Sequence, residues 1–391
     1  KECLGRTTYE YFLQSTDHAR DWGQGQIDNA KSLHLYSREG LFTFLLVRHY
    51  DRIKGDYCMT IDVHAHYLSP SLADGLRKRT EAPRIEQLDD GRERYHMPHG
   101  TLMLSDAYYD IDARLAYMDG LGVTRQILSF PGLFGVDSLP IEDCADLLAG
   151  FNDHVAGIAE AHPTRFSGLA ALPLADMDEA VREYRRARLD LGLVGAILPV
   201  NLLVTADHAA SLAPVFAAAQ ELGGHLFVHP GRRPDEVPPA GTAQNSSPHA
   251  DNMAARLALA VQDRCAAAMV TLVFSDFLDA YPDVSLHVAN LGGTLPMVVE
   301  RMDQVTLTRT PGDPAPSSFL KRVHVDCSSL GPRAIEIAAA FYGADKILFG
   351  TDCPIFMTDW SLDAVANSRL SDADKHAIRE GNAARLLETL V

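Results

Sequence analysis

Residues 61–66 read Ile61-Asp62-Val63-His64-Ala65-His66, a β-strand pattern that ends in two histidines. Side chains on a strand alternate between its two faces, so His64 and His66 point to the same side. From here to the C-terminus, short runs rich in Val, Ile and Leu alternate with longer stretches that have helical spacing. This rhythm predicts an α/β fold of the (β/α)8 TIM-barrel type. A doubly wound sheet is the alternative, but it would usually carry a glycine-rich phosphate turn after the first strand.

Eight runs are predicted to be the strands of this barrel. They are residues 60–66, 124–130, 166–173, 193–199, 224–230, 284–291, 323–327 and 346–352. The helices predicted between them include residues 141–161, 176–191, 208–222, 331–342 and 371–388. Two connections are much longer than the others, residues 67–110 and residues 231–250. Both would lie at the C-terminal mouth of the barrel, where such barrels build their active sites, so we expect them to cover a substrate.

The first 58 residues differ from the rest of the chain. They carry equal numbers of acidic and basic residues, and their apolar residues show no sustained period. We therefore predict the barrel domain over residues 59–391 and a separate segment over residues 1–58. This segment is either an N-terminal extension or, as the favoured interpretation, a misassigned start with Met59 as the natural first residue, because Met59 directly precedes the first strand.

Composition restricts the kinds of partner. The 35 Lys+Arg and 52 Asp+Glu residues give a formal net charge of −17, and so acidic a surface repels nucleic-acid phosphates and anionic lipid. No apolar run approaches the ~20 residues of a membrane span. The cysteines are too sparse for a disulfide framework, which favours a reducing cytoplasm. We expect a cytoplasmic protein with a small-molecule partner and no nucleic-acid or membrane partner; a homodimer stays open.

Four polar residues lie at the predicted C-terminal ends of three strands. His64 and His66 end the first strand, His229 ends the fifth and Asp352 ends the eighth. The carboxyl ends of barrel strands meet at one mouth, so three imidazoles and one carboxylate would converge there. Such a set suits one divalent metal ion, with Zn²⁺ expected first and Mn²⁺, Fe²⁺ or Co²⁺ as alternatives.

Five motifs follow one another between residue 59 and the C-terminus. They are Ile61-Asp62-Val63-His64-Ala65-His66, Val228-His229-Pro230, Asn290-Leu291-Gly292-Gly293-Thr294-Leu295-Pro296, Phe349-Gly350-Thr351-Asp352-Cys353-Pro354 and Gly381-Asn382-Ala383. Together they resemble the amidohydrolase-related family, and within it the aminocarboxymuconate-semialdehyde decarboxylase branch. The resemblance implies a metal-dependent (β/α)8 barrel with His64, His66, His229 and Asp352 as metal ligands.

The resemblance also implies an activity. The leading hypothesis is non-oxidative decarboxylation of a small, planar, carboxylated compound, with Asp352 as the proton carrier. The alternative is hydrolysis of a lactone, ester or amide, in which the metal lowers the pKa of bound water and Asp352 takes the proton. A third hypothesis, from another class, is a catalytically inactive metal-binding barrel.

One position departs from the pattern of the decarboxylase branch, which carries a histidine before the Gly-Gly pair. This chain has Asn290 there. A carboxamide cannot exchange a proton near neutral pH as an imidazole can, so we expect Asn290 to orient a water molecule or a substrate oxygen. The nearby His287 has the opposite strand parity and is predicted to point away from the barrel interior.

The substrate-binding arginine of the branch is also missing, because Leu102 stands at its expected position. The candidates to replace it are His96, His99, Arg232 and Arg233. Asp326 could accept a hydrogen bond from a liganding histidine or cap a helix. Phe356 and Trp360 could form an apolar wall for a planar substrate or simply pack the last loop.

Overall fold

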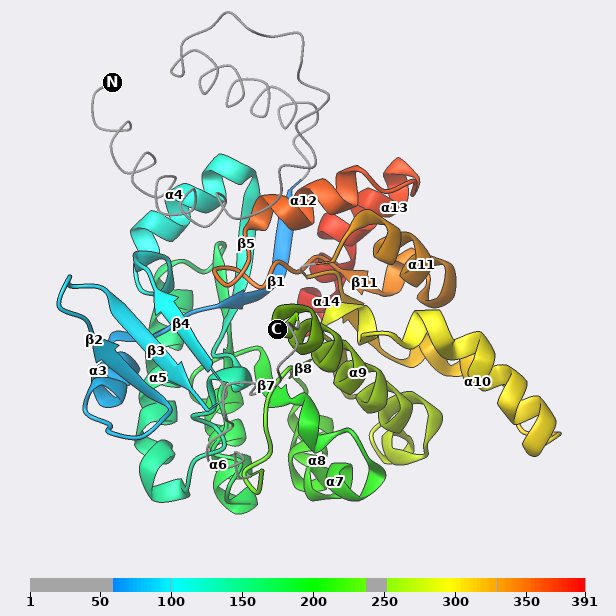
Figure 1. Ribbon diagram of the computed structural model, residues 1–391, viewed down its shortest axis with the longest axis horizontal. Coiled ribbons are helices and arrows are strands. Elements are labelled where there is room, and N and C mark those ends of the chain that lie inside the picture. The colour runs from blue at the N-terminus through cyan, green and yellow to red at the C-terminus, as the bar shows by residue number, and fades with distance from the viewer. Residues whose placement is uncertain (1–58, 99, 237–251, 329, 391) are drawn as a thin grey trace, which may run out of the picture. The chain divides into compact units, whose positions relative to one another are not determined.

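The computed structural model describes residues 59–98, 100–236, 252–328 and 330–390 (Figure 1). Eight of the described strands form one parallel sheet in the order β1-β5-β6-β7-β8-β9-β10-β11. They are β1 (Thr60–His66), β5 (Val123–Ser129), β6 (Phe166–Ala170), β7 (Gly195–Pro199), β8 (His225–His229), β9 (Ser285–Val288), β10 (His324–Asp326) and β11 (Ile347–Leu348). The segment after β11 returns to β1, where Val63 N donates to Phe349 O at 2.9 Å and His66 N donates to Cys353 O at 2.7 Å. These bonds bring the two ends of the sheet together, which confirms the predicted (β/α)8 barrel.

Helices surround the sheet and connect its strands (Figure 1). They are α4 (Ile111–Leu121), α5 (Ile141–Ala161), α6 (Met177–Leu189), α7 (Ala206–Ser211), α8 (Ala213–Leu222), α9 (Met253–Phe274), α10 (Leu295–Arg309), α11 (Pro332–Tyr342), α12 (Thr358–Ala366), α13 (Asp372–His376) and α14 (Asn382–Glu388). The helix predicted over 208–222 is two helices, because Pro214 in the first turn of α8 has no N–H to extend the preceding helix. A π-helical turn, residues 377–381, interrupts the one predicted over 371–388.

The strands are buried on both faces, as expected for a parallel sheet covered by helices. Side chains from successive strands pack together inside the barrel; they include Ile61, Val63, Ile127, Leu169, Ile197 and Phe227. A register shift in β1 between Asp62 and Ala65 lets both Val63 and His64 face the interior. The intervening side chains pack against the surrounding helices. Phe227 is an inner residue of β8, so His225 and His229 share its face and also lie toward the interior.

The predicted connection over residues 67–110 has structure of its own. It contains α3 (Pro70–Arg77) and an antiparallel sheet of β2 (Arg84–Gln87), β3 (Glu93–Met97) and β4 (Gly100–Leu104), followed by the short 3₁₀ helix η2 (Asp106–Tyr108). The buried Tyr95 of β3 donates through its hydroxyl to Phe134 O at 3.2 Å. This contact fixes the insertion against the loop that follows β5, at the mouth of the barrel.

Helix α9 departs from the expectation that no apolar stretch approaches the length of a membrane span. Residues 254–274 are long and apolar enough to cross a membrane by length and composition alone. Nevertheless, Cys265, Met269 and Leu272 of this helix are buried in the core around the barrel. Packing against the rest of the domain accounts for the apolar character of the C-terminal half of α9, whereas Leu257 and Leu259 in its N-terminal half are 62% and 56% exposed.

Two predictions concern residues that lie largely outside the described part of the chain. The first concerns residues 1–58. The division into an extension and a barrel domain therefore stays a prediction, as does the alternative start at Met59. The connection predicted over 231–250 is described only for residues 231–236.

Candidate metal centre

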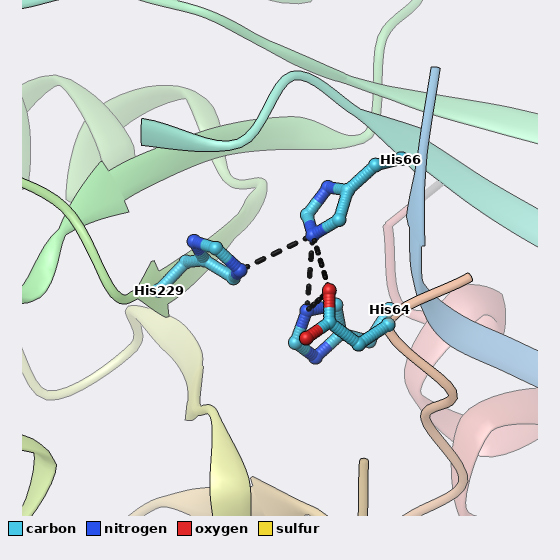
Figure 2. A group of neighbouring side chains, drawn as sticks. His64, His66 and His229 are labelled. Atoms are coloured by element: carbon cyan, nitrogen blue, oxygen red, sulfur yellow. Dashed lines mark hydrogen bonds and ion pairs between the residues drawn. The ribbon is translucent and has the colours of Figure 1, made fainter. Parts of the chain in front are cut away.

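The four predicted ligands come together at the carboxyl ends of their strands. His64 and His66 belong to β1, His229 is the last residue of β8, and Asp352 follows β11. Their potential ligand atoms all lie within 4.8 Å of one another, and all four residues are buried. Figure 2 shows the three imidazoles pointing toward a common centre. Within the described part of the chain, this is the one group of side chains arranged to hold a metal ion.

The distances inside this group fit a small metal ion. His66 Nε2 lies 3.2 Å from His64 Nε2, 3.1 Å from His229 Nε2 and 3.0 Å from Asp352 Oδ1. Four ligands bound tetrahedrally to one zinc ion at ~2.0–2.2 Å would be roughly 3.3–3.6 Å apart. Asp352 Oδ1 is buried and accepts no aligned hydrogen bond from the described residues. The donor set and this unpartnered oxygen are therefore suited to a cation.

The second ring nitrogen of each histidine is already engaged. His64 Nδ1 lies 3.1 Å from Asp326 Oδ2, His66 Nδ1 lies 3.1 Å from Ser129 Oγ, and His229 Nδ1 donates to Pro230 O at 2.8 Å. Such partners fix the ring orientation and leave Nε2 for the metal. Of the two roles expected for Asp326, the structure shows the contact with a candidate liganding histidine.

The chain turns sharply to place Asp352. The strand predicted to reach residue 352 ends at Leu348, and Asp352 has a left-handed φ of 61°. Its backbone N–H donates to His64 O at 2.8 Å, while Thr351 Oγ1 donates to the buried Asp62 at 2.7 Å. A Cβ atom on Gly350 would lie only 2.9 Å from His64 Cβ. A glycine at 350 therefore lets this segment approach β1 closely enough to bring its carboxylate to the histidines.

Burial and neighbouring charges shift the pKa values of the four residues in different directions. Burial lowers the pKa of His66, and burial together with the neighbouring histidines lowers that of His229 well below its usual value. Burial also opposes charge on His64, but Asp326 and Asp352 raise its pKa to about 10. Although burial favours protonation of Asp352, His64 and His66 hold its pKa below its usual range. Two neutral imidazoles and an ionised carboxylate are the protonation states that metal ligation requires.

Asn290 lies beside the centre but has a different immediate contact. It is buried in the 3₁₀ turn η6 (Asn290–Gly292), with φ of 57°. Its Oδ1 accepts from Ser328 Oγ at 2.9 Å, and its backbone N–H donates to Asp326 Oδ1 at 3.3 Å. Asn290 therefore supports Asp326, the residue that holds His64; whether its amide faces a substrate stays a prediction.

The prediction for His287 is wrong. Its ring stacks on Phe227 with centroids 4.1 Å apart, so it lies inside the barrel. Strand β9 ends at Val288, and Asn290 and Leu291 then adopt left-handed conformations. Asn290 therefore does not continue the alternation of the strand.

The candidates for the missing arginine differ in their surroundings. His96 Nε2 lies 2.7 Å from Glu86, and Arg233 Nε lies 2.8 Å from Asp235, so both already have carboxylate partners. Arg232 is buried, and its Nε has no hydrogen-bond partner among the described residues. His99 lies outside the described residues. Phe356 and Trp360 are 47% and 59% exposed, so they do not form a buried apolar wall.

Two buried residues were missed by the sequence analysis. The hydroxyl of Tyr108 and Oδ1 of Asp137 are buried and have no hydrogen-bond partner among the described residues. Burial raises the pKa of Tyr108, and the nearby charge of Asp352 adds to the shift, so this phenol is a neutral donor close to the metal ligands. Both residues belong to loops at the carboxyl end of the barrel. Their position in these loops is the feature of the sequence that could have marked them as candidates for the site.

Comparison with known proteins gives consistent matches over most of the chain. The sequence profile of the amidohydrolase family matches residues 61–389. The 2-amino-3-carboxymuconate-6-semialdehyde decarboxylase of Dictyostelium discoideum is 26% identical over 348 residues, which cover 84% of this chain and 91% of that protein. The gamma-resorcylate decarboxylase of a Polaromonas species is 29% identical over 295 residues, which cover 71% of this chain and 87% of that protein.

Solved structures confirm the fold. The 2,6-dihydroxybenzoate decarboxylase from Rhizobium has a TM-score of 0.62 and 22% identity, with 85% of this chain and 99% of that chain covered. A dihydroxybenzoic acid decarboxylase from Polaromonas, solved with bound manganese and the inhibitor 2-nitroresorcinol, has a TM-score of 0.62 and 23% identity, with 84% and 97% covered. The Metarhizium anisopliae IDCase has a TM-score of 0.69 and 20% identity, with 84% and 97% covered.

Proposed function

The chain belongs to the amidohydrolase family, and from this membership we propose that it is a metal-dependent carboxy-lyase. Its substrate is a small, planar, carboxylated compound, from which it removes CO2 without oxidation. The observation that carries the proposal is the convergence of His64, His66, His229 and Asp352 at the barrel mouth. The decarboxylase names of the relatives support this reaction over hydrolysis.

We propose zinc as the resident ion, held by the three Nε2 atoms and by Asp352 Oδ1. Three imidazoles and one carboxylate suit zinc. Manganese is the main competitor, because a related structure contains it. When bound, the ion polarises the oxygens of the substrate and stabilises the negative charge that develops as the C–C bond breaks.

The side chains of the protein complete the reaction. As the C–C bond breaks, its electron pair stays on the carbon of the product and CO2 leaves. Asp352 takes a proton from solvent and passes it to that carbon, so hydrogen replaces the carboxylate. Tyr108 donates its unpartnered O–H to a substrate oxygen. Asn290 orients a second oxygen through its amide N–H groups, because its Oδ1 faces Ser328 Oγ at 2.9 Å.

The reaction is tested by separating CO2 release from water incorporation. Protein loaded in turn with zinc and with manganese is incubated in ¹⁸O-labelled water with carboxylated aromatics, such as 2,6-dihydroxybenzoate, and with simple lactones. We expect CO2 and the decarboxylated product from an aromatic acid. Label in a ring-opened lactone product would support the hydrolase alternative instead, and full metal occupancy with neither product would favour an inactive barrel.

A further inference from the structure

Arg232 lies directly beyond the metal ligand that ends β8, in the segment His229-Pro230-Gly231-Arg232. The loop after β5 packs against this segment. A Cβ atom on Gly132 would lie 3.6 Å from Gly231 Cα and 2.9 Å from Asp137 Oδ2. Two glycines therefore let the loops after β5 and β8 touch at the mouth of the barrel, and this contact brings the neighbourhoods of Asp137 and Arg232 together.

Arg232 is a buried cation that contacts no carboxylate among the described residues. It is 8% exposed, and within residues 59–98, 100–236, 252–328 and 330–390 its Nε has no hydrogen-bond partner and no ion pair joins it to a carboxylate. One donor, Nη2, bonds to the backbone carbonyl of Glu236. Arginine is rarely buried unless it is paired, because removing its charge from water is costly. The adjacent Arg233 shows the usual arrangement, with Asp235 at 2.8 Å.

Asp137 is the nearby acidic group, and it does not neutralise Arg232 by contact. It is 4% exposed, and its Oδ1 has no hydrogen-bond partner among the described residues. Burial raises its pKa to about 7, although the charge of Arg232 acts in the opposite direction. Near neutral pH a substantial share of this carboxyl group is protonated and can donate an O–H. A guanidinium and a carboxylic acid with free donor capacity thus lie close together at the barrel mouth.

We propose that Arg232, assisted by Asp137, binds an ionised carboxylate of the substrate. No described residue offers these two groups an ionised carboxylate in contact, and such a carboxylate accepts hydrogen bonds both from a guanidinium and from a protonated acid. Arg232 would then bind the substrate in place of the arginine whose expected position holds Leu102. The inference rests on the proposed function for the identity of the ligand as substrate, and it specifies that this substrate binds as an anion.

The test compares two probes that differ in charge but little in shape, salicylate and salicylamide. Their binding to the metal-loaded full chain is measured by isothermal titration calorimetry. We expect the natural protein to prefer salicylate. Arg232→Gln should weaken salicylate binding about 10- to 100-fold, as for the loss of a charge-assisted hydrogen bond, and should change salicylamide binding less than about threefold. Arg232→Lys should restore part of the salicylate affinity.

The neighbouring arginine provides a matched control. Arg233→Gln removes a guanidinium that already has a carboxylate partner, so it should leave the affinity for both probes unchanged. Metal content and circular dichroism establish that each variant is folded. Equal weakening of both probes by Arg232→Gln would show a structural role for Arg232 and overturn the inference. Equal affinities of the natural protein for the two probes, or no binding of either, would also overturn it.

The experiments test the carboxylate-binding subsite and the proposed function separately, so either hypothesis can be refuted without the other. If Arg232→Gln selectively loses salicylate while the natural protein releases no CO2 from any acid tested, the subsite stands and the proposed function fails. If CO2 is released and salicylate binding is insensitive to Arg232, the proposed function stands and the subsite fails.

Discussion

Strand β8 carries two inner histidines four residues apart, His229 and His225, and they belong to two different clusters. The upper cluster is His64, His66 and His229, which meet Asp352 with their Nε2 atoms directed to one point. The lower cluster is His225, His287 and His324, which lie side by side on β8, β9 and β10. In the lower cluster the rings of His225 and His287 stack 4.8 Å apart, and His225 Nε2 lies 2.5 Å from His287 Nδ1.

The difference shows what turns neighbouring histidines into a metal site. In the upper cluster each Nδ1 has a partner and each Nε2 is directed to the centre. In the lower cluster both ring nitrogens of His225 are used, by His287 and by Ser285 Oγ at 2.8 Å. Asp326 joins the clusters, since its Oδ2 lies 3.1 Å from His64 Nδ1 and 3.3 Å from His287 Nε2. Convergent free nitrogens and a carboxylate ligand, rather than the number of histidines, distinguish the upper cluster.

The largest effect should follow removal of a ligand from the upper cluster. The natural protein should hold about one metal equivalent per chain, and His64→Ala or Asp352→Ala should abolish it, because a four-ligand site that loses one ligand loses much of its affinity. His225→Gln is the matched control from the lower cluster and should keep the metal. Elemental analysis after dialysis measures all four proteins. Full metal content in both upper-cluster variants would show that these residues are not ligands.

A smaller effect should follow from adding an imidazole beside the upper cluster. Asn290→His should leave the metal content unchanged, since Asn290 contacts Ser328 and Asp326 rather than serving as a ligand. It should add an ionisation between about pH 5 and 8 and favour decarboxylation of planar acids, for which general acid–base help is typically worth roughly 10²–10⁴ in rate. The pH–rate profile measures it. A profile unchanged from that of the natural protein would show that position 290 does not face the reacting atoms.

Tyr108 tests whether the unpartnered atoms near the upper cluster serve the substrate. Tyr108→Phe should lower kcat about 10- to 100-fold while metal content is retained, because one donor to a developing negative charge is lost. Tyr95→Phe is the control, since that buried hydroxyl already donates to Phe134 O. Steady-state kinetics on the acid found to release CO2 measure both. If the two variants lose the same activity, the Tyr108 hydroxyl has no special part in the reaction.

The sequence predicted the barrel and the convergence of the four candidate ligands, and the reasons are physical. Buried parallel strands read as continuous apolar runs, so all eight were located within a few residues. Strand ends in a barrel share one mouth, so His64, His66, His229 and Asp352 could be combined without knowledge of their distances.

The remaining features depend on contacts that no local pattern encodes. The inward position of His287 was missed because the left-handed residues 290 and 291 break the alternation that the parity argument assumed. Arg232 and Arg233 are adjacent and alike in sequence, and only the folded loop shows which one is buried. The unpartnered hydroxyl of Tyr108 likewise becomes apparent only once its surroundings are in place.

Removing the contact between His287 and Asp326 should lower metal affinity moderately. His287→Leu removes the imidazole that contacts Asp326 from the lower cluster while filling the space beside Phe227 with an apolar group. We expect metal affinity to fall about tenfold, the lower part of the range for residues that support a metal ligand. Competition with a chelator of known affinity measures it, and His287→Gln, which keeps an N–H donor, should recover part of the loss. Unchanged affinity in His287→Leu would make the two clusters independent.

The smallest effect concerns the stability of the lower cluster in acid. Burial, together with Lys346 and His287, lowers the pKa of His324 from 6.5 to about 4. Below about pH 6.5 the unfolded chain therefore binds a proton at His324 that the folded protein does not bind. The stability that neutral His324 contributes is present above pH 6.5 and is lost as pH falls toward 4. The full shift corresponds to at most about 3 kcal/mol, and solvent screening of this partly exposed ring reduces it to about 1 kcal/mol. Urea unfolding at pH 7, 5.5 and 4.5 should show the natural protein losing this amount relative to His324→Gln, which cannot take up the proton. Parallel losses in the two proteins would show that His324 does not contribute to the acid sensitivity, which would then have to come from other groups such as His225 and His287.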